Sequence, residues 1–183
     1  MNQKRISIKS EIIMALLKKE THGREISEYL KVPLTTIQRT LSSLEQDNVI
    51  DYKIIGKSKV YFIKKSLSAR KYVSDAENYK MIKLIGHYPY LEPLIKDILN
   101  VKSHLVILFG SYAKFNAKKD SDIDLYIETD KLYIKKETES KNSRLSVKIG
   151  LFNPDDLLIK EIIKNHVIIK GVDEFYEKTK LFD

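Results

Sequence analysis

Two aspartates separated by one apolar residue, Asp122 and Asp124, are the side chains of this sequence best suited to hold a metal ion. Apolar Ile123 and Leu125 alternate with them, and this period of two predicts a β-strand with one buried face. Both carboxylates would then point to the same side, about 6 to 7 Å apart. Carboxylates this close repel each other unless a cation lies between them. Because hard oxygen ligands suit Mg²⁺ and Mn²⁺, we expect one of these ions here.

A possible phosphate-binding turn precedes the aspartates. The apolar run 105–109 (LVILF) predicts a strand that leads into Gly110 and Ser111, and Asp122 follows twelve residues after this glycine. Glycine adopts backbone dihedrals that are barred to other residues and lets a ligand approach the backbone closely. The Ser111 hydroxyl and the amides that follow it can donate to phosphate oxygens. The strand, turn and acidic pair therefore predict a site for a phosphate and its metal.

Together these features resemble the DNA polymerase beta-like nucleotidyltransferase superfamily, in particular the minimal nucleotidyltransferases. The common family run GSRARGTARPDSDIDL corresponds here to GSYAKFNAKKDSDIDL, residues 110–125. The resemblance implies transfer of a nucleoside monophosphate from an NTP to a hydroxyl, with pyrophosphate leaving. It places Gly110 and Ser111 at the β and γ phosphates and Lys114 where it offsets developing charge. The two aspartates would be both the metal ligands and the catalytic residues.

Three positions depart from the family run: Tyr112 replaces a basic residue, Phe115 replaces a glycine, and Lys114 stands where relatives carry arginine. A simpler alternative makes the acidic pair solvated side chains of an exposed edge strand. The apolar alternation and the preceding turn favour the metal-binding interpretation.

The family's third carboxylate is not found. It should come from the segment 144–152, which contains a strand predicted at 145–152, and the two plausible alignments give Lys148 or Gly150 there. Glu128 shares the predicted strand face of the acidic pair and could substitute. Two functions therefore stay open: a Mg²⁺-dependent nucleotidyltransferase, or a domain without catalysis that senses nucleotide or only dimerises.

The first third of the chain is the most basic. Residues 1–65 hold 13 Lys and Arg against 7 Asp and Glu, which gives +6 of the total net charge of +8. Apolar spacing predicts three helices there, followed by two strands at 49–55 and 60–63 around a turn at 56–59. This order resembles a winged helix-turn-helix domain and implies binding to double-stranded DNA.

In that geometry the second helix of the helix-turn-helix pair enters the major groove. The expected contacts to bases and phosphates are Thr35, Thr36, Gln38, Arg39 and Ser42, with Lys57 and Lys59 on the wing. The alternative is a winged helix that contacts only protein. The positive charge favours DNA, and the combination with the second domain predicts a transcriptional regulator.

Between the two parts, Tyr72, Val73, Ala76, Tyr79 and Ile82 recur at helical spacing. This face would either pair with a second copy, making a homodimer, or pack on its own chain. Further along, residues 129–143 are predicted to be a mobile loop. A helix is predicted at 155–165, with Asn153 as its cap.

The whole sequence predicts an α+β protein of three parts: a winged helix-turn-helix domain (1–65), a helical linker (66–88) and a nucleotidyltransferase-like domain with a mixed β-sheet flanked by helices (89–183). Its 183 residues, 43% hydrophobic and 32% charged, are ordinary for a globular protein. The absence of cysteine excludes disulfides and cysteine-bound zinc. No run is long and apolar enough for a membrane span, so we expect no membrane partner and a cytoplasmic location.

Overall fold

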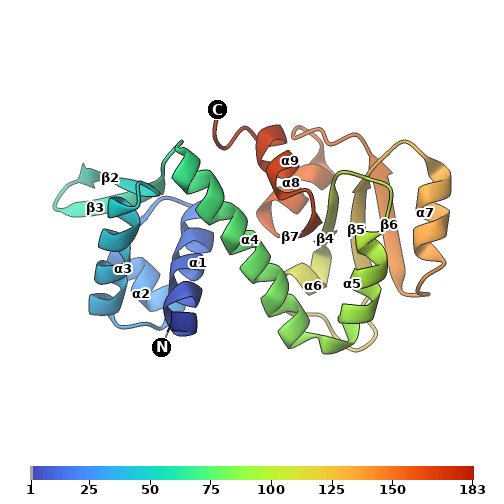
Figure 1. Ribbon diagram of the computed structural model, residues 1–183, viewed down its shortest axis with the longest axis horizontal. Coiled ribbons are helices and arrows are strands. Elements are labelled where there is room, and N and C mark those ends of the chain that lie inside the picture. The colour runs from blue at the N-terminus through green and yellow to red at the C-terminus, as the bar shows by residue number, and fades with distance from the viewer. Residues whose placement is uncertain (1) are drawn as a thin grey trace. The chain divides into compact units, whose positions relative to one another are not determined.

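Two units make up the chain in the computed structural model, which describes the backbone of residues 2–183 and the side chains of residues 8–183 (Figure 1). The first unit holds residues 1–79 with 181–183, and the second holds residues 80–180. The first contains helices and a small antiparallel sheet, and the second contains a larger mixed sheet flanked by helices. The predicted α+β class is therefore confirmed.

The first unit follows the predicted order of three helices and a hairpin. Its elements are α1 (Asn2–Lys18), β1 (Thr21–His22), α2 (Gly23–Leu30), α3 (Leu34–Gln46), β2 (Ile50–Ile55) and β3 (Ser58–Ile63). The predicted apolar stripes form its core, where Ile12, Ile26 and Ile37 are almost completely buried. The sheet order is β1-β3-β2. Strand β1 was not predicted, because two residues are too short to show a period.

The hairpin turn is tighter than predicted. Ile55 pairs directly with Ser58, so the connection consists of Gly56 and Lys57 alone. Gly56 has φ of +62°, the left-handed backbone that such two-residue turns require. The predicted four-residue turn is therefore wrong, and Lys59 belongs to β3 rather than to the tip of the wing.

The predicted linker forms a single helix, α4 (Leu67–His87). Part of the face suggested for pairing is occupied within the chain: Val73 and Ala76 are fully buried, whereas Ile82 is exposed. The Tyr72 hydroxyl donates to the carboxylate of Asp47 at 2.7 Å. These contacts match the alternative in which the face packs on its own chain, and they give no support to a homodimer through this helix.

The second unit begins within α4 and builds a four-stranded sheet in the order β6-β5-β4-β7 (Figure 1). Strands β5 and β6 are parallel, whereas β4 is antiparallel to both of its neighbours. The remaining elements are η1 (Pro89–Leu91), α5 (Glu92–Leu99), β4 (Val106–Phe109), α6 (Gly110–Ala113), β5 (Ile123–Glu128), α7 (Leu132–Glu139), β6 (Leu145–Gly150), α8 (Leu157–Lys164), β7 (Val167–Lys170) and α9 (Val172–Lys178).

One face of this sheet carries the hydrophobic core, to which α4, α5, α6 and α7 contribute. Its members include Leu84, Leu91, Leu94, Ile95, Ile98, Val106, Leu108, Tyr112, Ile123, Leu125, Ile127, Val147 and Ile169. The opposite face carries the alternate residues of β5, which are Asp124, Tyr126 and Glu128. Aromatic rings fill the Tyr126 part of that face, with Phe152 6.1 Å from Tyr126 between ring centroids.

Two local predictions in this unit are wrong. Residues predicted as a mobile loop form α7, which buries Ile134 and Thr138, one helical turn apart. This narrow stripe is hidden among charged residues, so it gives a weak periodic signal. Helix α8 begins at Leu157 rather than 155, with Asp156 as its cap. The Asn153 side chain instead accepts a hydrogen bond from the Asp155 amide in the preceding turn.

Within the part described, no helix is both long and apolar enough to cross a membrane.

Candidate functional site

The glycine turn after β4 lies directly against the acidic pair. The Cα atoms of Phe109 and Asp124 are partners across β4 and β5, and α6 begins at the next residue, Gly110. Gly110 has φ of +69°, and a Cβ placed on it would lie 2.2 Å from the Asp124 Oδ2 atom. Only glycine therefore permits this approach of the turn to the carboxylate. The predicted phosphate-binding turn and one predicted metal ligand are in contact.

Asp122 and Asp124 do not both belong to the strand. Asp124 is a half-buried residue of β5, whereas Asp122 is exposed and lies just before the strand begins. The prediction that both lie in the strand is therefore wrong for Asp122. Burial and then the negative charge of Asp122 raise the pKa of Asp124 above its ordinary value. The two carboxylates are thus close enough to repel each other, as expected of a pair that a cation would stabilise.

Strand β6 places a hydroxyl beside this pair. In the parallel register Asp124 is opposite Ser146, Tyr126 is opposite Lys148, and Glu128 is opposite Gly150. The hydrogen bond from Ser146 to the Asp124 carboxylate, and the positive charge of Lys148, partly offset the rise in its pKa. Ser146 is thus the β6 residue nearest in register to Asp124. Neither alignment made from the sequence selected it.

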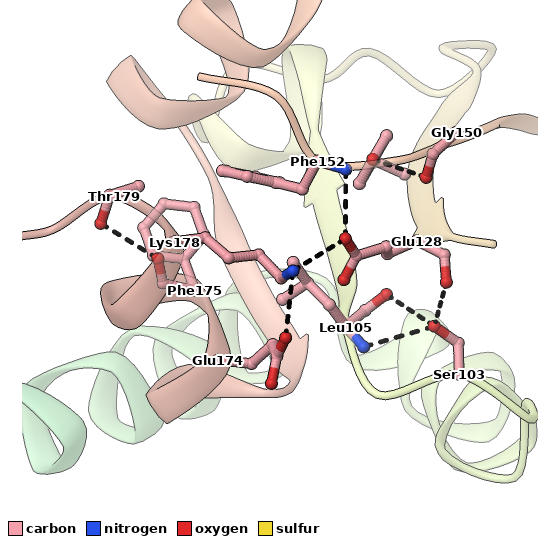
Figure 2. A network of polar contacts seen from close by, with 10 residues as sticks. Ser103, Leu105, Glu128, Gly150, Phe152, Glu174, Phe175, Lys178 and Thr179 are labelled. Carbon is pink, nitrogen blue, oxygen red and sulfur yellow. Dashed lines mark hydrogen bonds and ion pairs between the residues drawn. The ribbon is translucent and has the colours of Figure 1, made fainter.

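Glu128 does not fill the place of the third carboxylate. Its Oε1 atom accepts a hydrogen bond from the Phe152 amide at 3.1 Å and lies 3.0 Å from the Lys178 Nζ atom (Figure 2). Ser103 donates to its backbone carbonyl at 2.9 Å. These contacts tie β5 to α9 and to the chain after β6. The Glu128 carboxylate therefore has a structural role at the end of β5 that lies away from the acidic pair.

No metal-binding cluster of three or more His, Cys, Asp or Glu side chains was found among the residues described. The donors present at the acidic pair are two carboxylates. Such a set suits one Mg²⁺ ion, because Mg²⁺ is usually held by one or two carboxylates together with waters and substrate phosphates. A second ion would need a further carboxylate ligand, which these two donors do not supply.

Lys114, predicted to face the phosphates, forms an ion pair with Glu161 of α8 at 3.2 Å. Both side chains are substantially exposed, so this pair contributes little to stability and can open. The Glu161 charge also helps to raise the pKa of Asp124. Glu161 was not identified from the sequence, because nothing in its local pattern distinguishes it from a solvated helix residue.

Arg144 fixes the segment that leads from the glycine turn to the acidic pair. Its carbonyl accepts a hydrogen bond from the Ile123 amide at 2.8 Å, and its guanidinium donates to the Lys119 carbonyl at 2.8 Å. The guanidinium also lies 3.4 Å from the hydroxyl of Tyr112. The position that is basic in the family run is thus a buried tyrosine, and a basic group reaches it from the turn that precedes β6. Burial and the Tyr90 hydroxyl raise the pKa of Tyr112 to about 12, so the hydroxyl stays protonated.

Phe115 keeps the backbone that the family glycine would adopt. Its φ is +56°, in the left-handed region, where a side chain costs about 1 to 2 kcal/mol. The ring packs on the hydrophobic core and lies 5.8 Å from the His87 ring between centroids. This packing offsets the backbone strain and preserves the path of the loop.

On the first unit, α3 presents four of the five predicted DNA-contacting side chains to solvent. Thr35, Gln38, Arg39 and Ser42 are exposed, and their spacing places them on one helix face. Thr36 is half-buried.

The two wing lysines differ from each other. Lys57 is exposed in the hairpin turn. The ammonium of Lys59 lies 3.6 Å from the centroid of the Tyr52 ring. Lys59 is therefore held against its own hairpin, whereas Lys57 is exposed in the turn and available to DNA.

Comparison with known families identifies both parts of the chain in the predicted order. Residues 11–64 match the family model of the TBPIP/Hop2 winged helix domain. Residues 94–175 match the model of the polymerase beta nucleotidyltransferase domain. Both resemblances recognised in the sequence are confirmed. No match to the chain was found among curated proteins or among solved structures.

Proposed function

We propose that this chain, a winged helix domain followed by a nucleotidyltransferase-like domain, is a DNA-binding transcriptional regulator whose second domain binds a nucleoside triphosphate with Mg²⁺ or Mn²⁺. The observation that carries the nucleotide-binding part is the contact of Gly110 with the Asp124 carboxylate, since it brings the phosphate-binding turn against a metal ligand. The proposed domains keep the boundaries 1–65, 66–88 and 89–183.

In this proposal Asp122 and Asp124 hold one metal ion, which when bound neutralises phosphate charge and orients the triphosphate. Gly110 brings backbone amides close to the phosphates, and the Ser111 hydroxyl donates to a phosphate oxygen. Lys114 can leave its exposed pair with Glu161 and offset charge that develops on the leaving phosphates. These groups bind and position a nucleotide whether or not it reacts.

A second candidate is a regulator that binds nucleotide without transferring it. The presence of Ser146 opposite Asp124, where a third carboxylate would help activate an attacking hydroxyl, favours this candidate. Labelled NTP with Mg²⁺ separates the two. Pyrophosphate release or a labelled acceptor identifies an enzyme, whereas saturable binding without either identifies a sensor. Absence of binding for all four NTPs, with Mg²⁺ and with Mn²⁺, would refute both.

DNA binding should weaken steeply as salt concentration rises, because each phosphate neutralised adds about 0.9 to the log-log slope. Lys57→Ala should flatten the slope more than Lys59→Ala, since Lys59 is stacked on Tyr52. Arg39→Ala or Gln38→Ala should instead change the preferred sequence. Fluorescence anisotropy with duplex DNA at several salt concentrations measures both effects.

Lys96→Ala serves as the control, since it removes an exposed positive charge from the second unit. If the wild type and the three lysine variants all show the same salt-dependence slope, the assignment of the wing lysines as DNA contacts is wrong. If the protein does not bind DNA even at low salt, the winged helix is a protein-contact domain instead.

A homodimer could place two winged helices on neighbouring half-sites, which would increase DNA affinity. Val73 and Ala76 are buried within the chain and so are not free to pair, whereas Ile82 of the same predicted face is exposed. We therefore propose DNA binding without assigning a pairing surface.

A further inference from the structure

We infer that Lys148 binds the phosphates of the nucleotide directly, so that this domain holds its ligand with one divalent cation and one lysine ammonium group in place of a second metal ion. The inference rests on the proposed nucleotide binding and specifies how it is achieved. The ligand class is a nucleoside polyphosphate.

The strand register places Lys148 on the face of the acidic pair. Because β5 and β6 are parallel and Asp124 pairs with Ser146, the side chains of Ser146 and Lys148 emerge on the same face as Asp124. Lys148 is one strand step beyond Ser146, opposite Tyr126. A lysine side chain is long enough to reach from there towards the carboxylates and the glycine turn.

Lys148 is available to a ligand. It is exposed, and it makes no hydrogen bond or ion pair with any residue in the described part of the chain. Its cross-strand neighbour Tyr126 does not compete for it, since the Tyr126 hydroxyl donates to the Gly150 carbonyl at 2.9 Å. Lys114, by contrast, is already paired with Glu161. Lys148 is therefore a cation beside the acidic pair that can bind phosphate without first breaking an ion pair.

The groups that β6 contributes to the site oppose a second metal ion. A third carboxylate on β6 would give such an ion an anionic ligand, whereas this strand offers the hydroxyl of Ser146 and the positive charge of Lys148. An ammonium repels a divalent cation and attracts phosphate oxygens, with which it forms charge-assisted hydrogen bonds. This face of β6 thus offers a ligand for phosphate rather than a third carboxylate for a metal ion.

Calorimetry on the full chain with inorganic tripolyphosphate and with ATP and GTP tests this inference. Lys148→Met keeps the approximate length of the side chain and removes its charge. This substitution should weaken the binding of tripolyphosphate by about tenfold or more, and the binding of each nucleotide that the wild type binds by the same factor. The loss should appear with and without Mg²⁺, because Lys148 acts on the phosphates and not through the metal. Lys131→Ala, a matched loss of an exposed lysine after the far end of β5, should have no effect.

Manganese titration followed by electron paramagnetic resonance tests the number of metal ions. Wild-type protein with bound nucleotide should take up one Mn²⁺ per chain, and the double variant Ser146→Asp with Lys148→Met should take up two. Thermal unfolding of each variant checks that it is folded.

The outcomes separate the inference from the proposed function. If wild-type protein binds nucleotide and Lys148→Met binds it equally well, or if wild-type protein takes up two Mn²⁺ ions, the inference is wrong while nucleotide binding stands. If wild-type protein binds neither tripolyphosphate nor any NTP under these conditions, the proposed nucleotide-binding function itself is wrong.

Discussion

Replacing both aspartates, by Asp122→Asn with Asp124→Asn, should abolish Mg²⁺-dependent nucleotide binding and leave the fold at least as stable as before. The loss should be large, because neutral amides are poor substitutes for carboxylates as Mg²⁺ ligands. The fold should persist because Asp122 is exposed and Asp124 is half-buried, with an amide of almost the same shape replacing each carboxylate. Calorimetry with NTP in the presence and absence of Mg²⁺ measures the binding.

Without metal, the difference in stability between the double variant and the wild type should depend on pH in a defined direction. Burial and Asp122 raise the pKa of Asp124 in the folded chain, so ionising it opposes folding. Below the ordinary aspartate pKa of about 3.9 the carboxyl is protonated whether the chain is folded or unfolded, and this cost is absent. The cost appears as pH rises through that value towards the raised one. The double variant should therefore match the wild type near the low-pH limit and equal or exceed its free energy of unfolding at pH 7.

Asp130→Asn is the matched control, since it removes an exposed carboxylate beyond the other end of β5. It should change neither Mg²⁺-dependent binding nor the pH profile. If the double variant keeps the Mg²⁺-dependent nucleotide affinity of the wild type, the metal ion binds at another site.

The substitution Gly110→Ala should destabilise the protein and remove nucleotide binding together. Its methyl group would lie 2.2 Å from the Asp124 Oδ2 atom, so either the carboxylate or the turn must move. The φ of +69° adds strain that alanine bears poorly. We expect a loss of about 2 to 3 kcal/mol in the free energy of unfolding, of which about 1 to 2 kcal/mol comes from the backbone. Chemical denaturation and calorimetry measure the two effects.

The chain contains a control that separates these two causes. Gly56 has φ of +62°, close to that of Gly110, but a Cβ there would meet nothing within 4 Å. Gly56→Ala should therefore show the backbone cost alone and keep nucleotide binding. If both substitutions destabilise the protein equally and both variants keep their nucleotide affinity, the contact between the turn and Asp124 is not required for nucleotide binding.

The parts of the site that lie close together along the chain could be predicted from the amino-acid sequence. The apolar strand, the Gly110 turn and the acidic pair fall within residues 105–124, where periodicity and backbone preference act between near neighbours. The exposed face of α3 was predictable for the same reason, since Gln38 and Arg39 lie off the buried stripe. The helix α7 was missed because only a narrow part of it is buried.

The residues that join the acidic pair from distant parts of the chain became known only from the fold. The parallel register of β5 and β6 places Ser146 opposite Asp124, and packing of the elements after β6 brings Glu161 near the same carboxylate. A shift of two residues in that register would keep every side chain on its face and would select Lys148 instead, so alternation alone cannot choose between them. Strand pairing over this separation depends on the core that α7 and β6 share with β5. The same long-range packing gives Glu128 its pairing with Lys178, although strand periodicity had made it a candidate metal ligand.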